Sequence, residues 1–179
     1  MIRLFIGLGL PDAERARLGG LAVGMPGVRW MPPASLHLTV RFLGETEEGL
    51  AREIDTALQT LRAPPVPVRL EGLGVFGKGA RRHTLWAGVA ASPELGLLKG
   101  RVDAALRDLG LEADSRAFTP HVTLARMTRP HEERLQQFIE GHSLEVAGGF
   151  VAPAFVLYSS HLGHEAPHYR EEAVYPLQG

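Results

Sequence analysis

The chain has 179 residues and no cysteine. This absence excludes disulfides, thiolate nucleophiles, iron–sulfur clusters and zinc sites that need sulfur, and it fits a reducing compartment. Long apolar runs are also missing: the longest early run, Leu4 to Leu10, is too short to span a membrane and is not followed by a cleavage-site pattern. We therefore expect a cytoplasmic protein that does not bind membranes. Any catalytic group must be His, a carboxylate, Ser or Thr, Lys or Tyr.

An excess of charge of either sign is absent as well. The 19 basic and 20 acidic residues give a formal charge of −1, so no global field exists to hold a long polyanion. A nucleic-acid partner would have to be held locally. With 45% apolar residues the composition is that of a soluble globular protein, and the length allows one domain or two small lobes that share a core. We expect a monomer.

Segments of strand-like alternation take turns with segments of helical period, which predicts an α+β fold built from two-layer lobes. Strands are expected over residues 3–10, 36–43, 66–75, 83–91, 118–126, 144–151, 154–159 and 170–177. Helices are expected over residues 12–23, 47–62, 93–109 and 132–140. Ser92 is expected to cap the third helix and Gly110 to end it, and Gly141 to end the fourth.

The most informative feature is a repeated tetrapeptide. His37-Leu38-Thr39-Val40 recurs as His121-Val122-Thr123-Leu124, 84 residues further on, with one copy in each half of the chain. Chance predicts about 0.07 His-x-Thr triplets with apolar residues at both other positions. A single copy would be weak evidence for a site, but two copies are strong.

Strand geometry gives this repeat a physical meaning, because successive side chains point to opposite faces. In the first copy Leu38, Val40 and Phe42 are expected on the core face, with His37, Thr39 and Arg41 on the other face. In the second copy Val122 and Leu124 face the core, while His121 and Thr123 face away. If two similar lobes pack around a pseudo-twofold axis, the two His-Thr pairs line opposite walls of one cleft.

Two histidines across a small anionic group suit general acid–base catalysis, in which one takes a proton and the other gives one. Cleavage of a phosphodiester or a cyclic phosphate needs both events. Thr39 and Thr123 could hold non-bridging phosphate oxygens, and Arg126 could add charge stabilisation. Strict alternation would turn Arg126 to the apolar side, so this role requires the strand to end or bulge near Ala125.

The residues around both tetrapeptides resemble the 2H phosphoesterase superfamily, and in particular its RNA 2′,3′-cyclic phosphodiesterase branch, historically called 2′-5′ RNA ligase. The resemblance runs nearly end to end. It is carried by Arg3-Leu4-Phe5-Ile6, by residues 37–44 with the Phe-Leu-Gly tail, by residues 85–89, by residues 118–126 with Pro120 before the second His, and by Leu157-Tyr158-Ser159-Ser160 ahead of Tyr169.

This resemblance implies one bilobal domain over residues 1–179, with antiparallel sheet, outer helices and one motif per lobe beside a central cleft. It implies hydrolysis of a terminal 2′,3′-cyclic phosphate of RNA to a 2′-phosphate without metal or cofactor, and possible reversal as 2′-5′ ligation. His37 would donate the proton and His121 would accept one. Thr39, Thr123 and Arg126 would bind phosphate, and Phe42 would pack on the terminal nucleoside.

Other features compete with this interpretation. The two histidines could be buried and hydrogen-bonded within a sheet, with Thr serving as a strand former. Residues 72–78 approach dinucleotide and phosphate-loop motifs, but a strand-like segment follows them where a helix is needed, so both matches are interpreted as false. A basic cluster follows at Lys78, Arg81 and Arg82. We interpret it either as a solvated turn or as a contact for the RNA backbone at the rim of the site.

The remaining histidines have no assigned role. His161, His164 and His168 lie in a loop that lacks helical ligand spacing, so we expect no metal there. His83, His131 and His142 are interpreted as surface or strand-end residues. Two alternative functions stay open: the same site could act on another cyclic or 2′-5′ linked nucleotide, or the chain could bind RNA ends without catalysis.

Overall fold

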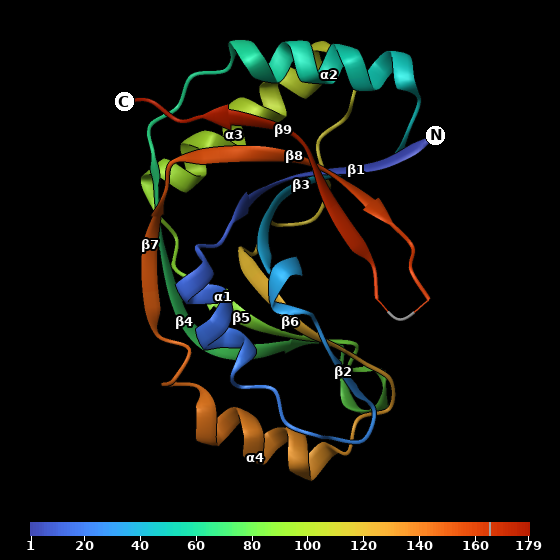
Figure 1. The fold of residues 1–179 in the computed structure, drawn as a ribbon, viewed down its shortest axis with the longest axis vertical. Helices are drawn as coiled ribbons and strands as arrows, with labels where there is room; N and C mark the ends of the chain where they lie inside the picture. Colours follow the sequence, from blue (N-terminus) through green and yellow to red (C-terminus); the bar gives the residue numbers. More distant parts are fainter. Residues whose placement is uncertain (165) are drawn as a thin grey trace.

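The computed structural model describes residues 1–164 and 166–179, and these residues form a nine-stranded antiparallel sheet with helices outside it (Figure 1). The strand order is β7-β4-β5-β6-β3-β1-β8-β9, with β2 paired to β6. The strands are β1 (Ile2–Gly9), β2 (Val28–Trp30), β3 (His37–Thr46), β4 (Val66–Phe76), β5 (Thr84–Val89), β6 (His121–Met127), β7 (Gly148–Ala152), β8 (Ala154–His161) and β9 (His168–Pro176). The predicted α+β class is confirmed.

The helices cover the outside of this curled sheet. They are α1 (Asp12–Gly19), α2 (Glu48–Thr60), α3 (Pro93–Asp108) and α4 (Glu132–His142), with short 3₁₀ turns η1 (Pro33–Ser35) and η2 (Gly79–Arg81). Figure 1 shows α2 and α4 at opposite ends of the molecule. None of the helices in residues 1–164 and 166–179 combines the length and the apolar character needed to cross a bilayer.

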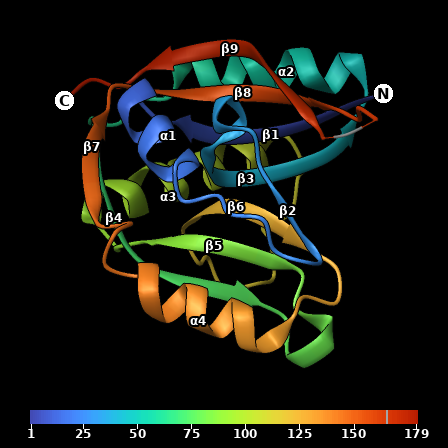
Figure 2. The same cartoon turned by 60° about the horizontal axis from the view of Figure 1, so that its bottom comes forward.

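The sheet consists of two halves, one formed by β3, β1, β8 and β9 and the other by β6, β5, β4 and β7. Figure 2 shows these halves one above the other. They meet where β3 and β6 pair at Leu38 and Val122, the second residues of the two tetrapeptides. Both side chains are fully buried. The two copies of the tetrapeptide, on β3 and β6, therefore lie next to each other where the two halves of the sheet meet.

The third helix follows the predicted pattern most closely. Ser92 accepts a hydrogen bond from the Leu95 backbone N–H at 3.1 Å, which is the expected N-terminal cap. Gly110 has a φ of +84° and ends the helix in the left-handed region, where glycine carries no Cβ penalty. The core side of α3 is lined by four buried apolar residues, Leu95, Leu98, Val102 and Leu106.

Several boundaries differ from the sequence prediction, and one strand was not predicted. Strand β3 extends to Thr46 rather than ending at residue 43, and β6 begins at His121 rather than at residue 118. Helix α1 ends at Gly19 rather than at residue 23, because two successive glycines, Gly19 and the C-cap Gly20, weaken the helix. Helix α4 continues through Gly141 to His142, so Gly141 does not end it. Strand β7 begins at Gly148 rather than at residue 144. Strand β2 was not predicted, because its three residues are too few to show alternation.

Candidate active site

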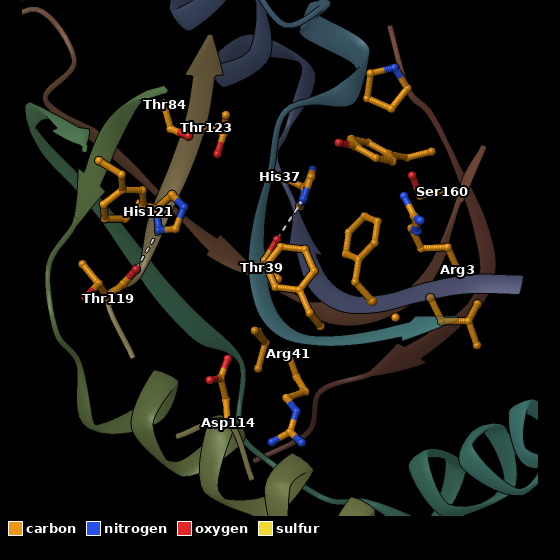
Figure 3. Close-up of a pocket in the computed structure, with 18 of the residues that line it drawn as sticks. Arg3, His37, Thr39, Arg41, Thr84, Asp114, Thr119, His121, Thr123 and Ser160 are labelled. Carbon is orange, nitrogen blue, oxygen red and sulfur yellow. Dashed lines mark hydrogen bonds between the residues drawn. The ribbon is translucent and has the colours of Figure 1, made fainter. Parts of the chain in front are cut away.

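Both His-Thr pairs line one cleft of about 710 Å³ between the two halves of the sheet. His37 and Thr39 come from β3, and His121 and Thr123 come from β6. Figure 3 shows the two imidazoles on opposite sides of this cleft. Phe42 and Arg126 line the same cavity, so the structure brings all six residues singled out from the sequence to one place.

The two motif strands share a conformation beyond the tetrapeptide. From each histidine onward, six residues have the same sequence of burial: partly buried, buried, partly buried, buried, buried, exposed. The pairing register slips in both strands after the Thr, so that Val40 and Leu124 are each the extra residue of a bulge. A bulge reverses the alternation beyond it. Residues five and six of each repeat therefore exchange faces.

This exchange corrects the predicted positions of Arg41 and Phe42. Arg41, expected beside the histidine, is only 7% exposed, and its guanidinium pairs with Asp103 of α3 at 3.0 Å. Phe42, expected on the core face, is 60% exposed and lines the cleft. Strict alternation failed here because it does not allow for the extra residue in the strand.

The matching bulge in β6 turns Arg126 into the cleft. The condition stated for its role, a bulge near Ala125, is met: Ala125 is buried and Arg126 is exposed. The Arg126 Nη1 donates a hydrogen bond to the Thr84 hydroxyl at 3.0 Å, which leaves other guanidinium donors free to face a ligand. Phe42 and Arg126 thus occupy equivalent positions in the two repeats, one apolar and one cationic.

The His37 ring is held at both nitrogens. Its Nδ1 lies 2.7 Å from the Ser35 carbonyl oxygen, and its Nε2 lies 3.0 Å from the Thr39 hydroxyl. A carbonyl can only accept, so Nδ1 carries the proton and, in the neutral ring, Nε2 accepts from Thr39. Nε2 is therefore the ring nitrogen that can gain and lose a proton.

The Nδ1 of His121 is held in the same way. It donates to the Thr119 carbonyl oxygen at 2.6 Å, so that in this ring too Nε2 is the nitrogen that can exchange a proton. Ser35 and Thr119 stand at the same offset, two residues before their histidines. The sequence repeat thus extends backward to a hydroxyl residue in both copies, a signal that could have identified these two carbonyl partners in advance.

Aromatic rings pack against both imidazoles. Tyr169 meets the His37 ring edge-on at 4.9 Å between centroids, and Phe76 meets the His121 ring in the same T-shaped geometry at 4.9 Å. Phe5 also packs on His37 at 4.7 Å, and Trp86 approaches His121 at 6.1 Å. This apolar surrounding disfavours the charged form of each ring.

The pKa values follow from this environment. Burial lowers the pKa of His37 from 6.5 to about 4, against the hydrogen bond to Ser35 that raises it, and the nearby His121, Arg126 and Arg15 lower it further. Burial also lowers the pKa of His121, against its bond to Thr119, and Arg126 adds to the lowering. At neutral pH both rings are neutral in the free site. An anion between them would favour protonation.

Two residues that sequence reasoning missed belong to the same cleft. Thr84, at the start of β5, is 1% exposed and accepts from Arg126. His83 was interpreted as a surface or strand-end residue, yet it lines the cleft with its Nδ1 2.8 Å from the Thr84 hydroxyl. No short motif marks either residue, because it is the pairing of β5 with β6 that brings Thr84 opposite Arg126.

The other sequence features lie outside this cleft. Lys78, Arg81 and Arg82 are not among its lining residues, and Arg82 pairs with Glu132 at 3.4 Å. His131 caps α4, and His142 pairs with Glu145 at 3.0 Å.

The histidine loop and the glycine-rich segment lie elsewhere too. His161 and His168 pair across the β8–β9 hairpin, with His164 in the loop between them. Among the described residues, no three His, Asp or Glu side chains are grouped to hold a metal ion. Residues 72–76 lie within strand β4, and only the three-residue η2 stands between β4 and β5. No phosphate-binding helix therefore begins there.

Comparison with solved structures shows that other proteins share this fold. A Thermus thermophilus protein aligns over 99% of both chains with a TM-score of 0.80 and 24% identity. Escherichia coli LigT, solved in complex with 3′-AMP, aligns over 99% of both chains with a TM-score of 0.79 and 21% identity. The curled sheet with two adjoining motif strands is thus the LigT-like α+β fold.

Sequence comparison then gives the family. The profile of the 2′-5′ RNA ligase superfamily matches residues 12–158. The RNA 2′,3′-cyclic phosphodiesterase of Archaeoglobus fulgidus is 31% identical over 97% of this chain and 99% of its own. The enzyme of that name from Geobacillus stearothermophilus is 30% identical over 90% of this chain, which spans only 51% of that protein. The chain belongs to the 2′-5′ RNA ligase superfamily.

Proposed function

We propose that this protein is a phosphodiesterase that opens terminal 2′,3′-cyclic phosphates of RNA to 2′-phosphates by two-histidine acid–base catalysis. The observation that carries the proposal is the convergence of two imidazoles on one cleft, each with Nδ1 fixed by a carbonyl, so that Nε2 is the nitrogen that can exchange a proton. The names of the relatives supply the substrate class, since several are RNA 2′,3′-cyclic phosphodiesterases.

The proposed reaction balances with these two groups alone. His121 Nε2 takes a proton from water as the water oxygen bonds to phosphorus. The bond from phosphorus to the 3′ oxygen breaks, and that oxygen takes the proton from His37 Nε2. The 2′-phosphate remains on the ribose, His121 is left protonated and His37 neutral. Exchange of one proton with solvent restores both rings. A 5′-hydroxyl that replaces water as the nucleophile would form the bond to phosphorus while the bond to the 3′ oxygen breaks, which is 2′-5′ ligation.

Other residues that line the cleft would bind the substrate and stabilise the negative charge on its phosphate. The Thr39 and Thr123 hydroxyls donate to non-bridging oxygens, and Arg126 adds a cation at the same phosphate. Phe42, exposed at the equivalent position of the other repeat, offers a face on which the terminal nucleoside packs. Because the pKa of His37 is low, its protonated form is a stronger acid. The negative charge of the bound phosphate favours this protonated form when substrate is present.

Product analysis with a chelator tests this function. An oligoribonucleotide that ends in a 2′,3′-cyclic phosphate should be converted to the 2′-phosphate, at the same rate with and without EDTA, because no step uses a metal ion. Phosphorus NMR identifies the product. A 3′-phosphate product, or loss of activity with EDTA, would contradict the proposed chemistry. Binding without turnover would favour the alternative of a non-catalytic RNA-end binding module, and turnover of small cyclic or 2′-5′ linked nucleotides alone would favour a different substrate.

A further inference from the structure

One wall of the cleft carries a surplus positive charge away from the histidines. The Arg41 Nη1 and the Lys99 Nζ each lie 3.0 Å from the same oxygen, Oδ1 of Asp103. In the part of the chain that the structure describes, neither cation has another carboxylate within ion-pair distance. One carboxylate thus balances two cations, and one positive charge is left over.

This surplus charge is poorly hydrated and faces the cavity. The Arg41 and Lys99 side chains are only 7% and 15% exposed, and both residues line the cleft. Asp114 and Arg116, on the adjoining loop, pair with each other at 3.4 Å and cancel. A partly buried cation without a counterion is costly unless a ligand supplies the missing negative charge. The open side of this cluster is the cleft itself.

The position of the cluster suits the next phosphate of an RNA strand. Arg41 follows Thr39 by two residues of β3, beyond the Val40 bulge, and Arg41, Thr39 and Lys99 all line the same cleft. Figure 3 shows Arg41 and Asp114 at one end of the cleft, beyond Thr39 and Thr119 as seen from the histidines. The Lys99 ammonium has three donors, and Asp103 engages one of them.

Lys99 is also held beside the loop that forms this wall. Its Nζ lies 5.4 Å from the centroid of the Phe118 ring, within cation–π range. Arg41 donates to the carbonyl of Glu112 at the other end of the same loop. These contacts keep the two cations at the cleft wall and not in bulk solvent, so an arriving phosphate would meet a largely preorganised site.

We propose that Lys99, supported by Arg41, forms an anion subsite for the phosphodiester on the 5′ side of the terminal nucleotide. The inference rests on the proposed function, because that function places the cyclic phosphate between His37 and His121. The subsite makes the protein prefer oligonucleotide ends to mononucleoside cyclic phosphates. A mononucleoside substrate lacks the phosphodiester that this cluster would bind.

The test compares a dinucleotide that ends in a 2′,3′-cyclic phosphate with the corresponding mononucleoside 2′,3′-cyclic phosphate. The measured quantity is the ratio of their kcat/KM values. Lys99→Met should lower this ratio about tenfold, the effect of losing one charge-assisted hydrogen bond. Arg41 and Asp103 then remain as a balanced pair, so the fold is preserved. Lys99→Arg should restore most of the ratio. Lys78→Met makes the same charge change outside the cleft and should leave the ratio as in the wild type.

Two results would overturn the subsite. One is a wild-type ratio in Lys99→Met. The other is an equal loss in Lys78→Met, which would assign the effect to general charge or to η2. If the wild type hydrolyses neither substrate, the proposed function fails. In that case the ratio of the equilibrium dissociation constants of the two compounds replaces the ratio of kcat/KM. The subsite is supported if Lys99→Met lowers the preference for the dinucleotide and Lys78→Met does not.

Discussion

Replacing either histidine of the repeat should abolish most turnover of a 2′,3′-cyclic phosphate. His37→Asn and His121→Asn should each lower kcat by about 10²- to 10⁴-fold, the usual loss when a positioned acid or base is removed. Asparagine keeps an N–H for the Ser35 or Thr119 carbonyl but has no titratable Nε2. The double variant should be little worse than either single variant, because groups that act together give non-additive losses. Steady-state kinetics at substrate saturation measures the effect.

His131→Asn is the matched control for these variants. His131 caps α4, and asparagine is itself a favourable N-cap, so this variant should turn over substrate at the wild-type rate. Urea unfolding of all four variants separates a loss of catalysis from a loss of fold. If either His37→Asn or His121→Asn retained kcat within about threefold of the wild type, proton transfer by that imidazole would not contribute to catalysis.

The second large effect is on stability, and it depends on pH. The pKa of His37 is about 4 in the folded protein and 6.5 without the fold. Between these values the unfolded chain binds more protons, so the free energy of unfolding falls as the pH falls through this window. The full contribution is present above pH 6.5 and is lost towards pH 4, and its size is about 3 kcal/mol.

Urea unfolding at pH 7, 5.5 and 4 measures this contribution of His37 to the free energy of unfolding. His37→Asn cannot titrate at this position, so its stability relative to the wild type should rise by about 3 kcal/mol from pH 7 to pH 4. His164→Asn, which changes an exposed histidine of the β8–β9 loop outside the cleft, should keep the wild-type pH dependence. A stability difference between His37→Asn and the wild type that stays constant over this range would show that the ring is not desolvated in the folded protein.

Local patterns were sufficient to predict most of the fold. Apolar residues at helical spacing and a Ser92 cap identified α3, alternation identified β4, and short apolar runs identified β1 and β8, because these signals reside in a few neighbouring residues. The helix boundaries that failed lie at glycines, whose effect depends on their neighbours. Two successive glycines end α1 at Gly19, whereas the single Gly141 stays helical because one glycine inside a helix is only mildly unfavourable.

The candidate site was predicted to the level of residue identity but not of orientation. The tetrapeptide repeat singled out both histidines and both threonines. It could not show the bulges at Val40 and Leu124, since a bulge is a property of two paired strands and not of one sequence. For the same reason Arg41 and Phe42 were placed on the wrong faces. Thr84 was missed because only the β5–β6 register brings it to Arg126.

Nitrogen-15 NMR of the two imidazoles during titration with a nucleoside 2′-phosphate tests most directly whether one phosphate meets both histidines. His37→Asn and His121→Asn assign the two Nε2 resonances. We expect one equivalent of ligand to shift both Nε2 signals with a single dissociation constant, each towards the protonated position, because the anion lies between the rings. A response of only one histidine, or two different dissociation constants, would contradict a shared site.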